Sequence, residues 1–371
     1  MQVLMSSTSY PETLQDWRGR FIANLAESLA RHEAVNLALW APPGAVSKQI
    51  RDAATVGDVN WLAHMSKRGG MAHLLRTRKA MAMPTIVSLL LRLGRAYRSK
   101  GADLIHVNWL QNALPLWGTR TPALVTVLGT DFALLKVPGM KALLRSVFKQ
   151  RRVILAPNAD WMHPALAGAF GDVAEVRTIP FGVDDAWFGL ERAQPVDEPH
   201  HWLAVTRVTK AKIGDLFAHG EGLFGQQRQL HLFGPMQEQM DIPHWVNYHG
   251  PTHPAELQQW FPKACGLATL SRHDEGRPQV MLEAMAAGLP IVASELPAHL
   301  NLLRHKEMGW LCNNRDDFAQ GLKWLEQADN NQSVGQASRQ WIKETVGTWD
   351  DCATRYVKAY ERLLEPVVHV A

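Results

Sequence analysis

The chain of 371 residues exceeds the usual length of one domain and predicts two domains of ordinary size. Hydrophobic residues at 46% and charged residues at 20% are typical of a globular protein with a sizeable core, not of a disordered chain. The net charge of +4 is uneven, because residues 1–190 contain 22 Lys and Arg against 13 Asp and Glu. The basic character therefore belongs to the N-terminal half.

Cysteine use and hydropathy both point to the cytoplasm. The three cysteines, Cys265, Cys312 and Cys352, lack metal-ligand spacing, and so few thiols indicate a reducing compartment without a disulfide framework. The run Val3–Met5 begins almost at once, with no signal segment before it. The longest apolar run, Ile86–Leu91, is too short to cross a bilayer. We therefore expect a cytoplasmic protein.

Short apolar runs alternate with helical patterns along the whole chain, which predicts parallel sheets built from βαβ units. A polar, proline-bearing stretch around 185–201 predicts a linker between two Rossmann-like domains with a ligand cleft between them. The predicted strands are Val3–Met5, Val35–Trp40, Leu104–Asn108, Ala123–Leu128, Val153–Ala156, Glu175–Ile179, Trp202–Thr206, Gln229–Phe233, Val246–Tyr248, Gly266–Leu270, Pro290–Ala293 and Trp310–Leu311.

The first loop of interest follows the first predicted strand. Residues Asp16–Arg20 precede a helical pattern in which Phe21, Leu25 and Leu29 share one face. Loops between a strand and a helix bind ligands in α/β domains, so Gly19 is a candidate binding residue. A plain connecting turn is the alternative.

Two segments of the N-terminal half contain no acidic residue. In Val59–Ala102, basic residues are interleaved with leucines and methionines, and in Phe132–Ala159 a predicted helix has basic residues on one face and apolar residues on the other. This composition is typical of a helix lying on an anionic bilayer. The alternative is an ordinary domain helix with a solvated basic face. We expect no nucleic-acid binding, because no RNP signature or zinc spacing is present.

Cations follow the first predicted strand of the second domain. In the run WLAVTRVTKAKIGDL, Arg207, Lys210 and Lys212 come directly after the strand. Cations at the carboxyl end of a strand suit a diphosphate, because Arg can fork two oxygens and Lys supplies a mobile charge. A solvated turn is the alternative.

The run RHDEGRPQVMLEAMAAGLPIVAS, at 272–294, predicts a loop, a helix from Pro278 to Gly288 and a buried strand. Glu275 lies on the loop, and Glu283 lies one turn into the helix. The N–H groups at the helix start attract anions. The run therefore predicts a site for a ligand that carries both phosphate and hydroxyl groups.

This run resembles the signature of retaining glycosyltransferases of the GT-B fold (group 1, family 4-like), in which two glutamates are separated by seven residues. Further matches fall in the family's order: IPFGVD at 179–184, Arg207 with Lys212, LHLFGP at 230–235 and VNYHG at 246–250. The resemblance is specific over residues 179–312 and architectural before them. It implies two Rossmann-like domains facing across a cleft.

The resemblance also implies a role for each matching residue. Glu283 would accept hydrogen bonds from the ribose of a nucleotide-sugar donor, UDP- or GDP-sugar above all. Glu275 would act in catalysis by steadying positive charge at the anomeric carbon, and Arg207 and Lys212 would neutralise the diphosphate. The remaining donor contacts would come from backbone N–H groups of Gly276, Arg277, Gln279 and Val280. No Asp-x-Asp metal motif is present, so we expect metal-independent transfer with retention and no cofactor.

The N-terminal half departs from the family pattern. Leu128 stands where the family often has a histidine, whereas Gly129 and Asp131 match. Asp131 is then the candidate for a catalytic base or sugar ligand, and a helix-capping Asp is the alternative. The double glycine of the first loop is reduced to Gly19 alone. Gly19, Asn108 and Trp109 are the candidate acceptor-binding residues, and His106 is expected to be a packed core histidine.

We therefore expect an acceptor-binding domain over 1–190, a donor domain over 195–350, and a C-terminal helix within 351–371 that packs back on the first domain. The expected reaction is transfer to a carbohydrate or lipid-linked acceptor in bacterial polysaccharide or glycolipid synthesis, at the cytoplasmic face of the inner membrane. The alternatives are a nucleotide-sugar epimerase, a sugar phosphorylase, or a membrane-associated protein that binds nucleotide sugars without turnover.

Overall fold

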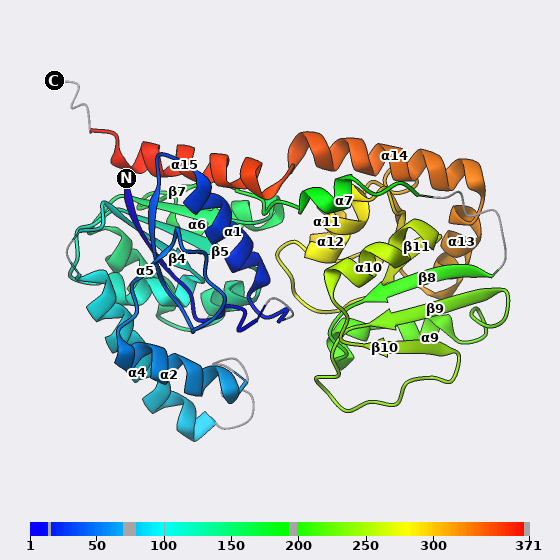
Figure 1. Ribbon diagram of the computed structural model, residues 1–371, viewed down its shortest axis with the longest axis horizontal. Helices are drawn as coiled ribbons and strands as arrows, with labels where there is room; N and C mark the ends of the chain where they lie inside the picture. Colours follow the sequence, from blue (N-terminus) through cyan, green and yellow to red (C-terminus); the bar gives the residue numbers. More distant parts are fainter. Residues whose placement is uncertain (14–15, 70–78, 100, 193–198, 367–371) are drawn as a thin grey trace. The chain divides into compact units, whose positions relative to one another are not determined.

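The computed structural model describes residues 1–13, 16–69, 79–99, 101–192 and 199–366 (Figure 1). The chain forms two compact units: unit 1 comprises Met1–Phe181 and Trp349–Ala371, and unit 2 comprises Gly182–Thr348. Each unit contains a parallel β-sheet with helices on both faces. This architecture confirms the predicted α/β class with two Rossmann-like domains.

The sheet of unit 1 has the strand order β3-β2-β1-β4-β5-β6-β7, and every pairing in it is parallel. Apart from β3, its strands match the predicted ones with ends that differ by a few residues. Strand β3 was missed because its two residues are exposed and charged, which leaves no apolar pattern to read. The strands are β1 (Gln2–Ser6), β2 (Asn36–Trp40), β3 (Arg51–Asp52), β4 (Leu104–Asn108), β5 (Ala123–Val127), β6 (Val153–Pro157) and β7 (Glu175–Val176).

The helices of unit 1 cover its sheet on both faces. Helices α1 and α15 bury their apolar stripes on one face, and α2, α4, η1, α5 and α6 cover the other. The helices are α1 (Arg20–Arg31), α2 (Val56–Lys67), α4 (Lys79–Tyr97), η1 (Leu110–Leu116), η2 (Thr130–Lys136), α5 (Met140–Phe148), η3 (Asp160–Met162), α6 (His163–Phe170) and α15 (Trp349–Leu364). Within the ranges that the structure describes, no helix has both the length and the apolar character to cross a membrane.

A buried polar network attaches α15 to the sheet of unit 1. His106 is fully buried, with Nδ1 2.6 Å from Tyr360 Oη and Nε2 2.8 Å from Thr126 Oγ1. Thr126 Oγ1 in turn lies 3.0 Å from the hydroxyl of Tyr356. Burial lowers the pKa of His106 to about 3, so its ring is neutral at pH 7. His106 is thus the core histidine that the sequence predicted.

We expect Tyr360→Phe to lower the free energy of unfolding by about 1–3 kcal/mol, because it leaves a buried histidine nitrogen without its partner. Urea unfolding at pH 7 measures this loss. Tyr248→Phe is the matched control, since that hydroxyl sits on a residue with 36% of its surface exposed. An equal loss in both variants would contradict a special role for the network.

The sheet of unit 2 has the strand order β10-β9-β8-β11-β12-β13 and is also parallel throughout. Its strands are β8 (His200–Val205), β9 (Arg228–Phe233), β10 (Val246–Gly250), β11 (Gly266–Thr269), β12 (Ile291–Ser294) and β13 (Trp310–Cys312). Its helices are α7 (Asp185–Phe188), α8 (Lys210–Ile213), α9 (Leu216–Gly220), α10 (Pro254–Trp260), η4 (Phe261–Lys263), α11 (Gln279–Ala286), α12 (Pro297–Leu300), α13 (Arg315–Leu325) and α14 (Ala328–Thr345).

The change from unit 1 to unit 2 lies between Phe181 and Gly182, earlier than the linker expected around 185–201. Helix α7 explains the difference, because its Trp187 packs on Phe261 of unit 2 with ring centroids 4.6 Å apart. No disulfide joins the three cysteines, all of which are buried and lie within the described residues.

A chain of three histidines runs across strands β8, β9 and β10. The rings of His201 and His231 are joined at 2.9 Å between Nδ1 and Nε2, and those of His231 and His249 at the same distance. Trp260 packs against all three rings. Burial lowers the pKa of each, that of His231 to about 4, and the positive charges of His200 and Lys263 add to the effect at His201 while Glu256 opposes it at His249.

This histidine chain is expected to make unit 2 sensitive to acid. Because the pKa of His231 is lower in the folded protein than its ordinary 6.5, stability is complete above pH 6.5 and falls as the pH drops toward 4. Between pH 7 and pH 4.5, wild type should lose about 2 kcal/mol more unfolding free energy than His231→Gln, because glutamine takes up no proton. Urea unfolding at the two pH values measures it, with the exposed His244→Gln as control. An unchanged pH dependence in His231→Gln would contradict the prediction.

Candidate functional site

Lys212 and Glu275 form the central ion pair of the candidate site in unit 2. Lys212 Nζ lies 2.6 Å from Glu275 Oε1, and each side chain has only 14% of its surface exposed. Burial lowers the pKa of Lys212, and the charge of Glu275 opposes that shift. The structure therefore joins two residues that the sequence had assigned separately, to the diphosphate and to the sugar.

Backbone contacts between two loops bring this pair together. The N–H of Arg272, in the loop after β11, donates to the carbonyl of Ala211 in α8 at 2.8 Å. Ser271 Oγ donates to Glu275 Oε1 at 3.4 Å, and Ser294 Oγ at the end of β12 donates to the carbonyl of Ser271. The loop with Glu275 is thus held between α8 and β12.

Arg207 lies two residues after the end of β8 and close enough to Lys212 for its charge to lower the pKa of that lysine further. Its Nη1 donates to Gln237 Oε1 at 3.4 Å. The turn after β9 approaches this segment so closely that a Cβ on Gly234, where φ is +134°, would lie 1.8 Å from the carbonyl oxygen of Thr206. A glycine is therefore required beside Arg207.

Helix α11 begins at Gln279, and no side chain caps its first turn. The N–H of Met281 donates to the carbonyl of Pro278, which leaves the N–H groups of Gln279 and Val280 available to an anion. Of the predicted donor residues, the Gln279 side chain donates to the carbonyl of Gly182 at 2.8 Å, and Arg277 Nη2 donates to Asn301 Oδ1 at 3.2 Å. Gly276 and Arg277 are both buried, and Val280 is partly buried against the core of unit 2.

Glu283 lies on the second turn of α11 with its side chain partly buried. Burial and the nearby charge of Asp184 raise its pKa to about 8. Among the residues that the structure describes, no cation or hydrogen-bond donor contacts its carboxylate. Glu275 and Glu283 thus differ, because Glu275 has a lysine partner and Glu283 has only a second acid beside it.

Two neighbours of these carboxylates were not assigned from the sequence. Asp184 could have been found, since it ends the IPFGVD run, but nothing in the pattern indicated that it faces α11. His299 is fully buried in α12, and its Nδ1 lies 2.8 Å from the carbonyl of Ser294. Burial lowers the pKa of His299. The negative charge of Glu275 opposes this shift, and the positive charge of Lys212 adds to it. A single histidine after a strand forms no sequence pattern from which a buried position near Glu275 and Lys212 could be predicted.

Asp131, predicted as an acceptor-side base, lies in unit 1 with 5% of its surface exposed. Its Oδ2 accepts from the N–H of Leu110 at 2.8 Å, and its Oδ1 accepts from the N–H of Leu128 at 2.9 Å. Burial raises its pKa to about 6, although these N–H groups oppose the shift. The carboxylate thus organises two backbone segments, and its role as a base stays a prediction.

The three candidate acceptor residues also have structural contacts in unit 1. Gly19 precedes α1 with φ +68°, and a Cβ there would lie 2.7 Å from the backbone of Ser9. Asn108 is buried, with Nδ2 donating to the carbonyl of Ser6 at 3.1 Å. Trp109 has the unusual φ of 69°, and its ring meets Phe21 edge to face. Such a conformation in a non-glycine residue is strained and is frequent at functional sites.

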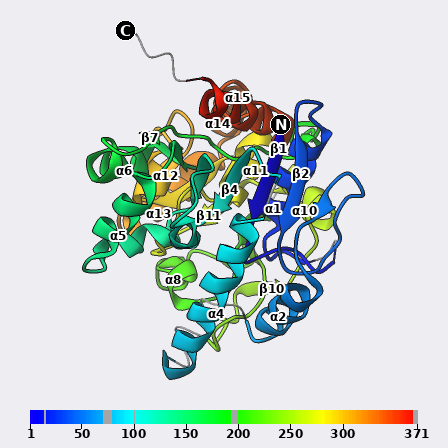
Figure 2. The same cartoon turned by 90° about the vertical axis from the view of Figure 1, so that its left-hand side faces the viewer.

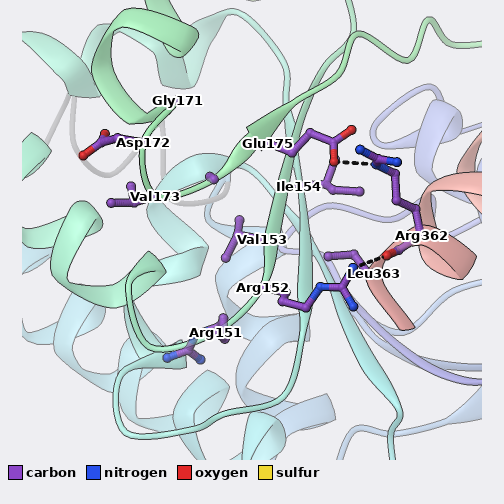
Figure 3. A pocket seen from close by; sticks show the side chains of 11 residues that line it. Arg151, Arg152, Val153, Ile154, Gly171, Asp172, Val173, Glu175, Arg362 and Leu363 are labelled. Carbon is purple, nitrogen blue, oxygen red and sulfur yellow. Dashed lines mark hydrogen bonds and ion pairs between the residues drawn. The ribbon is translucent and has the colours of Figure 1, made fainter. Parts of the chain in front are cut away.

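A cavity of about 370 Å³ in unit 1 lies at the amino ends of β6 and β7, away from all predicted site residues (Figure 3). Arg152 donates to the carbonyls of Arg362 and Glu365 at the end of α15, and Arg362 Nε lies 2.6 Å from Glu175 Oε2. These contacts hold the end of α15 against the sheet. In the described part of the chain, no group of three His, Cys, Asp or Glu side chains is placed to hold a metal ion.

Residues 205–327 match the family model of the glycosyl transferases group 1. The segment contains Arg207, Lys212, Glu275 and Glu283. Residues 205–327 form a glycosyltransferase group 1 domain. The predicted family resemblance is confirmed at this level.

Curated proteins that resemble this chain are also described as glycosyltransferases. The amylovoran biosynthesis glycosyltransferase AmsK of Erwinia amylovora is 26% identical over 188 residues, which are 46% of each protein. An uncharacterized glycosyltransferase of Haemophilus influenzae is 37% identical over 89 residues, covering 23% of this chain and 24% of the relative. The chain thus spans less than half the length of the curated relatives it matches.

Solved structures place the group 1 domain within a GT-B fold. A sucrose-phosphate synthase from Thermosynechococcus elongatus has a TM-score of 0.73 at 17% identity, over 98% of this chain and 99% of that one. HepE from Anabaena, in complex with UDP and glucose, has a TM-score of 0.66 at 12% identity, over 98% and 100%. These likenesses confirm the predicted fold class.

Proposed function

We propose that the chain is a retaining, metal-independent glycosyltransferase that moves a sugar from a UDP- or GDP-sugar to a carbohydrate or lipid-linked acceptor. The observation that carries the proposal is the Lys212–Glu275 pair in the group 1 domain, with Arg207 close by. Such a cluster offers two cations to a diphosphate and one carboxylate to the sugar attached to it. The HepE structures contain UDP, glucose or UDP-glucose, which supports a nucleotide-sugar donor.

The bond from the anomeric carbon to the diphosphate would break with its electron pair going to the leaving oxygen. Arg207 and Lys212 would stabilise that growing negative charge, together with the uncapped N–H groups at the start of α11. Glu275 would steady the positive charge at the anomeric carbon. Because these cations supply the charge that a metal would otherwise provide, the reaction needs no metal ion.

The other donor contacts would come from α11 and the loop before it. Glu283 would accept hydrogen bonds from the ribose hydroxyls. Its raised pKa fits a carboxyl group whose hydrogen-bond donors would come from the bound ribose. Backbone N–H groups of Gly276, Arg277, Gln279 and Val280 would contact the sugar and phosphate. The acceptor would bind in unit 1 through Gly19, Asn108 and Trp109, with Asp131 as base or sugar ligand.

We also propose a role in bacterial polysaccharide or glycolipid synthesis at the cytoplasmic face of the inner membrane. AmsK acts in amylovoran biosynthesis, and a lipopolysaccharide outer core galactosyltransferase, WaaB, shares the fold with a TM-score of 0.59 at 13% identity. The basic N-terminal half supports contact with an anionic membrane. Cysteines without disulfides fit a reducing compartment.

A panel of UDP-, GDP- and ADP-sugars, tested by thermal shift, would identify the donor, because a ligand of the folded state raises its apparent stability. The donor would then be incubated with candidate acceptors, and the anomeric configuration of the product determined by NMR. Retained configuration supports the proposal. Inversion, conversion of the donor alone, use of free phosphate, or binding without turnover would each overturn it in favour of another mechanism, an epimerase, a phosphorylase or a binding protein.

A further inference from the structure

Helix α4 of unit 1 is apolar on two opposite sides. Ala82, Leu89, Leu93 and Tyr97 are buried in the core beneath it. On the outer side, Met83, Val87 and Leu91 have 61%, 51% and 63% of their surface exposed. These three residues are spaced four apart, so they form one stripe along the helix. A helix that is apolar on the side facing solvent has a second contact surface.

The stripe continues into a basic and aromatic end. Arg95 follows Leu91 by four residues and is exposed. In the next turn, Arg98 Nη2 donates to the carbonyl of Trp117 at 2.7 Å, and Trp117 itself is 48% exposed. Figures 1 and 2 both show α4 running out to the margin of unit 1. We call Met83, Val87, Leu91, Arg95 and Trp117 the α4 face.

Helix α5 repeats this composition nearby. The N–H of Gly118, next to Trp117, donates to Gln150 Oε1 at 2.9 Å, just beyond the end of α5. Leu143 of α5 is 41% exposed, and Lys141, on another side of the same helix, is also exposed. The segment that bears Trp117 thus contacts the ends of both helices, each of which has exposed apolar and basic side chains.

The segment that contains α4 and α5 is strongly basic. Residues 59–159 contain sixteen Lys and Arg but only two acidic residues, Asp103 and Asp131. Asp131 is buried, and Asp103 accepts a backbone N–H from Gln2. In the described part of the chain, Arg92 and Arg145 are paired with Asp58 and Asp172, whereas Arg95 and Lys141 have no ion-pair partner.

We propose that the α4 face docks on a bilayer that carries anionic lipid headgroups. Exposed apolar side chains of a helix enter the boundary between headgroups and acyl chains, and the neighbouring cations meet the anionic headgroups. The aromatic ring of Trp117 suits the same boundary. A second protein would require complementary acidic residues, and a second copy of this basic surface would repel it. This proposal rests on the proposed function and names the surface through which the protein would contact the membrane. The contact needs neither a bound donor nor the transfer reaction.

The test is flotation of the full chain with vesicles, without nucleotide sugar. Vesicles with 30% phosphatidylglycerol are expected to bind the protein at least about tenfold more tightly than pure phosphatidylcholine vesicles. Met83→Ser with Val87→Ser and Leu91→Ser should abolish the binding, and Arg95→Glu with Lys141→Glu should weaken it about tenfold or more. Lys323→Glu and Leu300→Ser, at exposed positions of unit 2, are the controls. Circular dichroism and melting temperature establish that each variant is folded.

Equal binding to both kinds of vesicle, or equal loss in the unit 2 controls, would overturn the proposal. The proposal would also be overturned if the wild type were a dimer that does not bind vesicles and the serine variant were a monomer. The α4 face would then be a contact between two copies of the chain. Donor binding by thermal shift is measured on the same variants. A variant that loses vesicle binding but still binds the donor leaves the proposed transfer reaction unaffected. The two proposals can therefore be tested independently.

Discussion

Replacing Glu283 by Gln is expected to slow transfer strongly and at the same time to stabilise the protein at alkaline pH. Above pH 8, where Glu283 is ionised, a neutral amide accepts hydrogen bonds from ribose hydroxyls less strongly than its carboxylate, so we expect kcat/KM to fall about 100-fold or more there. Steady-state kinetics with the donor identified by thermal shift measure the fall. Glu221→Gln, at an exposed position in unit 2, is the control and should act as wild type.

The stability change follows from the raised pKa of Glu283. The folded protein keeps this proton up to about pH 8, whereas the unfolded chain loses it near 4.5. The folded state is therefore favoured by this group below pH 4.5 and loses that advantage as the pH rises to 8. Because Gln does not ionise, Glu283→Gln should be more stable than wild type at pH 8, on the order of 2–4 kcal/mol. Unchanged transfer would end the assignment of Glu283 to the donor, and an unchanged pH dependence would contradict its raised pKa.

Separating Lys212 from Glu275 should affect stability and activity in different ways. Lys212→Met leaves Glu275 largely buried without its cation and should cost about 3 kcal/mol of unfolding free energy. Glu275→Gln should cost less, since a largely buried lysine can lose its proton. Each variant should lower kcat by about 100-fold or more, because each loses charge where the transition state needs it.

The double variant, Lys212→Met with Glu275→Gln, should regain most of the lost stability and none of the activity. Unfolding in urea and steady-state kinetics on all four proteins complete the cycle. Arg304→Met breaks an ion pair in which both side chains are more than half exposed, so it should cost under about 1 kcal/mol. Recovery of transfer in the double variant would show that the pair is structural.

The sheets could be predicted from the sequence because their central strands are continuous apolar runs. Strand β4 is buried along its whole length, and so are β5 and β6. The donor site was also predictable, since Glu275 and Glu283 lie within one run whose spacing has a chemical meaning. Its pairing was not: Lys212 and Glu275 are 63 positions apart, and only the contact between α8 and the loop after β11 brings them together.

For the same reason, the sequence did not predict which distant groups its buried polar residues would contact. Asp131 accepts N–H groups from Leu110 and Leu128, and no pattern in the chain predicts the first of these. His106 meets Tyr360 across 254 positions. The sequence indicated that His106 was buried but not which hydroxyls would receive it.

Unit 1 is discontinuous, since its helix α15 follows unit 2 in the sequence. A ribosome therefore releases the whole of unit 2 before α15 can cover the apolar face that α1 shares with it. Until then that face is open to solvent, whereas unit 2 can fold as a single continuous segment. The N–H of Val183 donates to the carbonyl of Gly347 at 3.0 Å, so the two ends of unit 2 are fastened to each other. The first-made half is thus closed only after unit 2 has been synthesised, and a nascent chain cut short near residue 348 would be a substrate for chaperones.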